Sequence, residues 1–310
     1  MTYSSHTRSA QEFPAPREDP LIYPGSRPES SYVLADGIVW PITKCSTGNI
    51  QGSILNAKVQ RFNDTDSQSI NDLLQTKSAA PLEERFPVLG YGSNPVPGQI
   101  ISKFGQKAVV PVAYGSLPKA DVVYNLISNK GYAFAEILFD DENTEIRIAV
   151  SFLDEKQLKI MIDTEQNYHL SFSPVSVTLE LGDVIPGGLN GLCYIFAGFR
   201  KIWVPKTYIG PVPIAELPSK GRTRPPLTQE QILNLVVKEF GLNTRGIKTA
   251  RDLSDQLREE ETFEEKPGKL KYELQQAVEN DPRSLPPAAG SVILVPHARL
   301  PEKTFTGSLA

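Results

Sequence analysis

The feature that most constrains the fold is a succession of short apolar segments between residues 109 and 197, separated by turns. Residues 132–139 are almost continuously apolar, which is typical of a strand with both faces covered. Residues 145–150 alternate between polar and apolar side chains, and a turn at 140–143 pairs them with the preceding strand. Many short strands with few helices favour the α+β class, with a small, mostly antiparallel β-barrel or a curled sheet.

Further predicted strands cover residues 109–114, 122–124, 170–172, 175–181 and 192–197. Residues 32–40 predict a β-hairpin, because Asp36-Gly37 is a favoured two-residue turn. A Tyr-Gly-Ser sequence at 114–116 runs into Pro118 and predicts an ordinary turn.

A strand, a glycine-rich turn and the start of a helix follow one another between residues 86 and 105. The apolar run 86–89 leads into a turn that we name the 91–94 loop: Tyr91, Gly92, Ser93 and Asn94. Pro97 then opens a short helix that Gly105 closes. This order gathers backbone N–H donors around an anion or a carbonyl oxygen. The alternative is an ordinary turn, because loops of Gly, Ser and Asn are common.

A second helix begins near residue 155 and brings a carboxylate with it. Asp154 is a good N-cap, and Gln157 completes a capping box. Leu158 begins an apolar stripe, which Glu165 joins seven positions later if the helix continues that far. Desolvation raises the pKa of a carboxyl among core side chains and suits it to act as an acid or a base near neutral pH. The alternative is that the helix ends by Thr164 and leaves the glutamate in a surface loop.

The 91–94 loop resembles the signature loop of the γ-glutamylcyclotransferase-like superfamily, in which a Tyr-Gly-Ser-Asn turn holds the substrate. These families also carry a glutamate after a short helix that begins with Leu-Asp, a few residues before a tyrosine. Here Leu153-Asp154, Glu165 and Tyr168 match that order. The resemblance covers residues 86–197 and departs from the family pattern at Pro95, where an apolar residue is common.

The resemblance implies a small barrel of cyclotransferase-like type and an enzyme without a cofactor, which cyclises a γ-glutamyl amide to 5-oxoproline and releases an amine or amino acid. Glu165 is then the general acid and base, and the N–H groups of the 91–94 loop bind the substrate carboxylate or the oxyanion. Tyr91 shapes the pocket, and Tyr168 forms a hydrogen bond near the glutamate. One alternative is a fold relative that acts on another amide. The other is a non-catalytic binding or scaffold protein, which Pro95 and the long chain ends favour.

Composition divides the chain into four parts. Residues 1–30 are rich in proline and polar residues and predict an irregular or disordered arm. The resemblance implies a cyclotransferase-like domain over residues 31–204, with its core at 86–197. Residues 205–227 are again rich in proline and predict a linker or a wrapping segment. Residues 228–310 predict a helical extension, which is the interaction region in the binding-protein alternative.

The charge and the cysteines exclude several kinds of partner. The net charge of −4 argues against a nucleic-acid partner. No apolar run approaches the roughly 20 residues that span a bilayer, so we expect no membrane partner. Cys45 and Cys193 lie far apart and lack metal-ligand spacing to any histidine, so we expect reduced thiols, a cytoplasmic protein and no metal. The expected partner is a small γ-glutamyl substrate, and the oligomeric state stays open.

Overall fold

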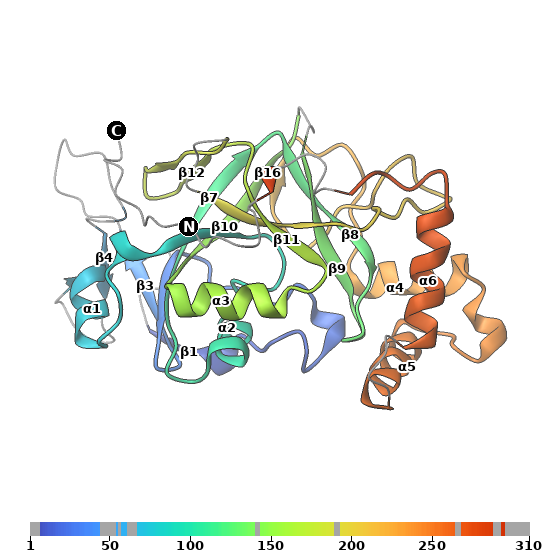
Figure 1. Ribbon diagram of the computed structural model, residues 1–310, viewed down its shortest axis with the longest axis horizontal. Helices are drawn as coiled ribbons and strands as arrows, with labels where there is room; N and C mark the ends of the chain where they lie inside the picture. Colours follow the sequence, from blue (N-terminus) through green and yellow to red (C-terminus); the bar gives the residue numbers. More distant parts are fainter. Residues whose placement is uncertain are drawn as a thin grey trace.

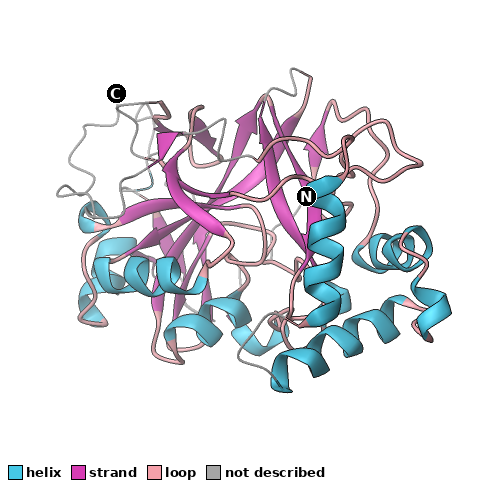
Figure 2. Ribbon diagram, turned by 45° about the vertical axis from the view of Figure 1, so that its right-hand side comes forward, coloured by secondary structure: helices cyan, strands magenta, loops and turns pink. Residues whose placement is uncertain are grey.

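The structure is a computed structural model, which describes residues 7–43, 54, 57–60, 67–139, 143–188, 193–263, 268–287 and 293–294. It is an α+β fold in which a large curved sheet occupies the centre and helices lie on its outside (Figure 1, Figure 2). Cys45 and the turn at 140–142 lie outside the described residues.

The main sheet has the strand order β16-β11-β14-β6-β10-β7-β2-β3-β4-β5. Its strands are β2 Tyr32–Ala35, β3 Ile38–Thr43, β4 Lys58–Gln60, β5 Ser67–Ser69, β6 Phe86–Gly90, β7 Val109–Pro118, β10 Glu145–Leu153, β11 Tyr168–Phe172, β14 Tyr194–Gly198 and β16 Ile293–Leu294. Shorter strands join its edges: β1 Arg8–Ser9, β12 Val177–Leu179, β13 Val184–Ile185 and β15 Ser219–Lys220. All neighbouring pairs are antiparallel except β14 and β6.

The expected closed barrel is not formed by the described residues. No pairing among them joins β16 to β5, and β8 (Ala120–Ile127) pairs with β9 (Ala133–Phe139) in a separate two-stranded sheet. The reason is that the other edge of β8 is already occupied. There the irregular segment 212–214 forms backbone hydrogen bonds with Val122 and Tyr124, and Pro213 has no N–H for a regular ladder.

Local sequence patterns explain much of the sheet. The predicted hairpin is confirmed, since β2 and β3 pair around Asp36 (φ 51°) and Gly37 (φ 78°), the two positive φ angles of a type I′ turn. The predicted turn at 114–116 is wrong, because this sequence lies inside β7. Its residues Gly115 and Ser116 pair with β10 on one side and with β12 on the other, so the sheet keeps them extended.

The N-terminal segment packs against the body of the protein. Its elements are short, strand β1 and the 3₁₀ turns Ala10–Glu12 and Pro20–Ile22, but the side chains of Phe13 and Tyr23 are each 3% exposed. The disordered alternative is therefore wrong for residues 7–30. Burial of these aromatic rings holds the segment in place.

The helices form two groups. In the first, α2 (Pro97–Phe104) and α3 (Glu155–Thr164) lie side by side along the main sheet, with α1 (Ile70–Thr76) at its far end (Figure 1). In the second, α4 (Gln229–Glu239), α5 (Ala250–Phe263) and α6 (Lys269–Asn280) lie next to β8 and β9. Short 3₁₀ turns cover Leu82–Glu84 and Leu242–Arg245. The apolar faces of α4 and α6 belong to the same hydrophobic core as the sheet, so the predicted helical extension is part of one folded body.

The proline-rich segment 205–227 is a wrapping segment. Its residues Val212, Ile214 and Leu217 are buried in the core. Arg222 donates from Nη2 to Asp121 at 2.6 Å, and the Asp121 side chain is fully buried. This buried ion pair fastens the segment to β8, which a mobile linker would not require.

Candidate functional site

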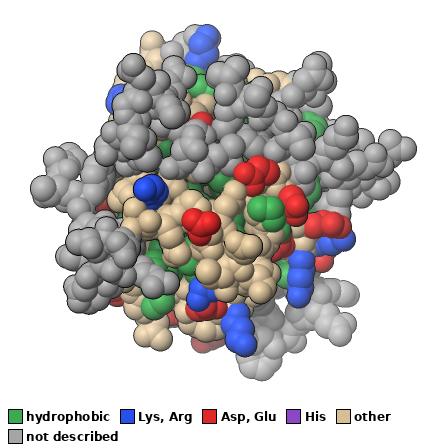
Figure 3. Space-filling model, turned by 90° about the vertical axis from the view of Figure 1, so that its left-hand side faces the viewer, with side chains coloured by type: hydrophobic (Ala, Val, Ile, Leu, Met, Phe, Trp, Pro, Cys, Tyr) green, Lys and Arg blue, Asp and Glu red, His purple; other side chains and the backbone are tan. Residues whose placement is uncertain are grey.

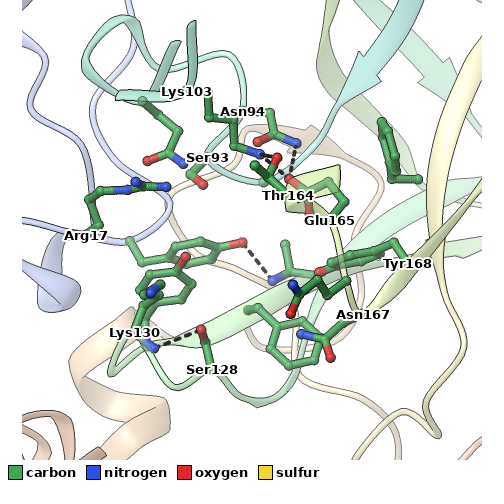
Figure 4. A pocket seen from close by; sticks show the side chains of 18 of the residues that line it. Arg17, Ser93, Asn94, Lys103, Ser128, Lys130, Thr164, Glu165, Asn167 and Tyr168 are labelled. Carbon is green, nitrogen blue, oxygen red and sulfur yellow. Dashed lines mark hydrogen bonds and ion pairs between the residues drawn. The ribbon is translucent and has the colours of Figure 1, made fainter. Parts of the chain in front are cut away.

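A cavity of about 450 Å³ is lined by residues from the end of α3, from α2 and from the β8–β9 hairpin (Figure 4). All of the site residues predicted from the sequence line it: Tyr91, Gly92, Ser93, Asn94, Glu165 and Tyr168. The loop and the glutamate, which are 71 positions apart in the chain at Asn94 and Glu165, therefore share one site.

The 91–94 loop follows β6 and is oriented by a residue from the N-terminal segment. Arg27 donates from Nη2 to the carbonyl oxygen of Tyr91 at 3.1 Å and also to that of Gly92. In a trans peptide the N–H points opposite to the C=O, so the N–H groups of Gly92 and Ser93 point away from Arg27. Within the described residues neither of these N–H groups donates a hydrogen bond, which leaves two donors for a ligand.

Two tyrosines pack against the loop: Tyr32 holds its end by a hydrogen bond, and Tyr23 restricts the residue at position 92. Tyr32 donates from its hydroxyl to the carbonyl oxygen of Pro95. Pro95 itself lacks an N–H, so the loop has one donor fewer than a loop with another residue at this position. At Gly92 an added Cβ atom would lie 2.7 Å from the Tyr23 hydroxyl, so only glycine allows this close approach.

Glu165 lies at the C-terminal end of α3 and turns toward the loop. The helix ends at Thr164, as the alternative proposed, but the Glu165 side chain is only 15% exposed and does not lie in a surface loop. Asn94 donates from Nδ2 to Glu165 Oε1 at 3.1 Å, and Lys103 forms an ion pair with the same oxygen. The expected apolar surroundings are therefore wrong: an amide and an ammonium group hold the carboxylate.

Lys103 was not predicted as a site residue. It lies in the last turn of α2, and its side chain is 4% exposed. Besides Glu165, its Nζ contacts Thr164 Oγ1 at 3.1 Å and Met161 Sδ at 3.2 Å. A lysine in the last turn of a helix is expected on sequence grounds to face solvent and to interact with the helix dipole. Only the packing of α2 against α3 turns it inward.

Three aromatic side chains that line the cavity, Tyr91, Phe134 and Tyr168, pack against one another and form an aromatic wall. The Tyr168 hydroxyl was predicted to form a hydrogen bond near Glu165. It donates instead to the backbone carbonyl oxygen of Ala135, at 2.7 Å. The ring of Tyr168 packs edge-on against Tyr91 and Phe134, with centroids 6.5 and 5.9 Å away. Burial raises the pKa of Tyr91 and Tyr168 well above the usual value, so both hydroxyls stay protonated.

Behind Tyr91 lies a buried carboxyl group that sequence reasoning also missed. Glu136, on β9, is completely buried, and its Oε1 accepts hydrogen bonds from the N–H groups of Ile137 at 3.0 Å and Gly198 at 3.3 Å. The Tyr91 hydroxyl donates to the carbonyl oxygen of Phe196 and lies 3.5 Å from Glu136 Oε1. Burial raises the pKa of Glu136 to about 8, so it is largely neutral at pH 7.

Basic residues line the side of the cavity across from Glu165. Arg17 comes from the N-terminal segment and Lys130 from the turn between β8 and β9 (Figure 4). Lys271, on α6, also lines the cavity. Together with Lys103 these cations outnumber the carboxylates Glu165 and Asp163 that line the same cavity. The cavity therefore favours a ligand with negative charge. Because Lys271 belongs to α6, the C-terminal extension contributes to the wall of the site.

The part of the chain that the structure describes shows no group of three or more His, Cys, Asp or Glu side chains that could hold a metal ion. Cys193 is buried, and burial raises the pKa of its thiol far above the usual range. No described helix has both the length and the apolar character needed to cross a bilayer. On the face shown in Figure 3, acidic and basic side chains of described residues are interspersed, without an extended basic surface there.

No family model, curated protein or solved structure matches the chain. The resemblance to the γ-glutamylcyclotransferase-like superfamily thus depends on the 91–94 loop, Glu165 and Tyr168. The site geometry is the basis for a functional proposal.

Proposed function

We propose that the protein cyclises a γ-glutamyl amide to 5-oxoproline and releases the amine or amino acid, with Glu165 as general acid and base. The observation that carries this proposal is the 3.1 Å contact between the Asn94 amide and the Glu165 carboxylate at one cavity. A catalytic base must lie within hydrogen-bond reach of the bound substrate, or one water away from it. The loop that would bind the substrate and the carboxylate that would act on it meet this requirement.

The free atoms of the site suit the steps of the reaction. Both polar contacts to Glu165 use Oε1, so within the described residues Oε2 has no hydrogen-bond partner and can accept a proton from the substrate α-ammonium. The freed amine attacks its own γ-carbonyl, and the N–H groups of Gly92 and Ser93 stabilise the oxyanion that forms. The aromatic wall holds the substrate in the folded conformation that ring closure needs. The excess of basic residues suits the carboxylates of such a substrate.

A non-catalytic binding protein is the second candidate, and the ion pair between Lys103 and Glu165 favours it. An ammonium group on the carboxylate competes with a substrate ammonium for the same negative charge. Pro95 also removes one possible oxyanion donor from the loop. In this case the cavity binds an anionic ligand without turnover, and the C-terminal helices serve as the interaction region.

Turnover distinguishes the two candidates. The purified protein is incubated with γ-glutamyl amino acids, γ-glutamylamines and glutathione, and 5-oxoproline is measured. Glu165→Gln keeps the shape and the Asn94 contact but cannot accept the proton, so it should lose at least about 10²-fold in kcat. Glu155→Gln is the matched control, because Glu155 is exposed at the other end of α3 and pairs with the exposed Lys159. No 5-oxoproline from any substrate, with the fold confirmed by circular dichroism, would favour the binding protein.

A further inference from the structure

We propose that Lys103 is a second catalytic residue, the general acid that protonates the departing amine while Glu165 acts as the base. This inference rests on the proposed cyclisation. It assigns the two proton transfers of that reaction to two side chains that are already in contact.

The geometry fixes Lys103 at the reacting end of the cavity. Its Nζ is in contact with Glu165 Oε1, and Thr164 Oγ1 at 3.1 Å and Met161 Sδ at 3.2 Å limit its movement. Both side chains line the cavity, together with the 91–94 loop. A lysine ammonium carries three hydrogens, and here each has an acceptor: Glu165 Oε1, Thr164 Oγ1 and Met161 Sδ. The thioether sulfur of Met161 is a weak acceptor, so Lys103 can turn that hydrogen toward a substrate and keep its contact with the carboxylate.

The chemistry calls for a donor of this kind. An alkylamine leaves a tetrahedral intermediate only when its nitrogen has been protonated. Transfer from a lysine ammonium to an alkylamine is close to balanced, because both nitrogens are aliphatic amines, and balanced transfers suit general acid catalysis. Glu165 cannot deliver this proton at the same time as its Oε2 removes one from the attacking nitrogen.

The steps balance as follows. Glu165 Oε2 takes a proton from the α-ammonium and passes it to solvent, and the amine attacks the γ-carbon to form the ring C–N bond and an oxyanion. Glu165 then takes the second proton from the ring nitrogen while Lys103 gives a proton to the leaving nitrogen. The oxyanion re-forms the carbonyl group as the bond between the leaving nitrogen and the γ-carbon breaks. The carboxyl group returns its proton to the neutral Lys103 through their contact, and the released amine takes up a proton from solvent to become an ammonium ion.

The competing explanation is that Lys103 only pairs with Glu165 and holds α2 against α3. Lys103→Arg separates the two roles, because a guanidinium keeps the ion pair but does not give up a proton in proteins. Lys103→Met removes both the charge and the proton. Lys107→Met is the control for the loss of a nearby positive charge, since Lys107 is exposed just after α2.

The test uses two substrates whose leaving amines differ in how much they need protonation by a general acid. γ-Glutamyl ethylamide releases an alkylamine, whereas γ-glutamyl 4-nitroanilide releases a weakly basic amine that departs with little help. We expect Lys103→Met and Lys103→Arg to lose about 10²-fold in kcat on the ethylamide and less than about fivefold on the nitroanilide. Glu165→Gln should lose activity on both, and Lys107→Met on neither. Circular dichroism and thermal unfolding show that each variant is folded.

Equal losses on the two substrates, or recovery of the ethylamide activity in Lys103→Arg, would overturn the acid role and leave the proposed cyclisation in place. Unchanged activity of both Lys103 variants would do the same. If the parent protein releases no 5-oxoproline from either substrate, the proposed function fails and this inference fails with it.

Discussion

Replacing the buried Glu136 by Gln should change how the stability of the protein depends on pH. The folded protein raises the pKa of this carboxyl from 4.5 to about 8, because burial removes water from its charged form. Between these two pH values the unfolded chain carries an ionised Glu136 while the folded chain keeps it protonated. The folded state then binds more protons, so the free energy of unfolding falls as the pH rises.

The size of the effect follows from the shift. Each pH unit in this window corresponds to about 1.4 kcal/mol, which gives a loss of about 3 kcal/mol by pH 7 and about 5 kcal/mol above pH 8. The contribution is fully present below pH 4.5 and is lost as the pH rises through about 8. Gln cannot ionise, so Glu136→Gln has no such loss. Its amide nitrogen takes the place of Oε2, which has no hydrogen-bond partner among the described residues, and this costs about 1–3 kcal/mol at every pH.

The two stability curves should therefore cross. At pH 5 the variant is less stable than the parent protein, and at pH 8.5 it is more stable by about 2–4 kcal/mol. Urea unfolding followed by tryptophan fluorescence, to which the buried Trp203 contributes, measures both proteins across this range. Glu155→Gln, which removes an exposed carboxylate, controls for the change in net charge. Parallel curves for Glu136→Gln and the parent would refute the reasoning, because Glu136 would then ionise alike in the folded and unfolded chains.

Three other substitutions test contacts around the site and the wrapping segment. Arg222→Met leaves the fully buried Asp121 without its closest partner and should lower the free energy of unfolding by about 3–5 kcal/mol, measured as a lower urea midpoint. Gly92→Ala places a methyl group against the Tyr23 hydroxyl and should cost about 1–3 kcal/mol, together with most of the turnover of a γ-glutamyl substrate. Arg27→Met frees two loop carbonyls and should raise KM and lower kcat for such a substrate, while an unchanged kcat/KM would show that the loop holds its shape alone.

Much of the sheet could be predicted because its signals are local. The apolar run at 132–139 and the alternation at 145–150 appear as β9 and β10, and the Asp36-Gly37 turn joins β2 to β3. The predicted pairing of β10 with β9 is wrong, because β9 pairs with β8, and β10 pairs with β6 and β7. Closure of a barrel depends instead on which distant strands meet. The sequence around Tyr114 resembles a turn, yet hydrogen bonds from strands on both sides keep it extended. No window of neighbouring residues contains that information.

Some residues of the candidate site could likewise be predicted from local sequence, and others could not. The 91–94 loop could be predicted because a glycine-rich turn is a local signal. Glu165 was expected on a helical stripe, and it lines the cavity although the helix ends before it. Lys103 and Glu136 could not be predicted in this way. The neighbouring sequence of a lysine at a helix end, or of a glutamate within an apolar strand, does not indicate whether the side chain faces a cavity or the core. Their surroundings result from the packing of α2 on α3 and of β9 against β14.

The position of the helix end links these observations to function. Had α3 continued past Thr164, Glu165 would lie one turn beyond Met161 on the apolar stripe, among core side chains. Because the helix ends one residue earlier, the glutamate backbone leaves the helical path and its side chain reaches both Asn94 and Lys103. Glu165, which alone would have to act first as base and then as acid, is thus paired with Lys103. In such a pair, Glu165 can act as the base and Lys103 as the acid. Alternatively, the two charges neutralise each other and the site only binds a ligand. Lys103→Arg distinguishes these two outcomes, because a guanidinium keeps the positive charge but does not donate a proton.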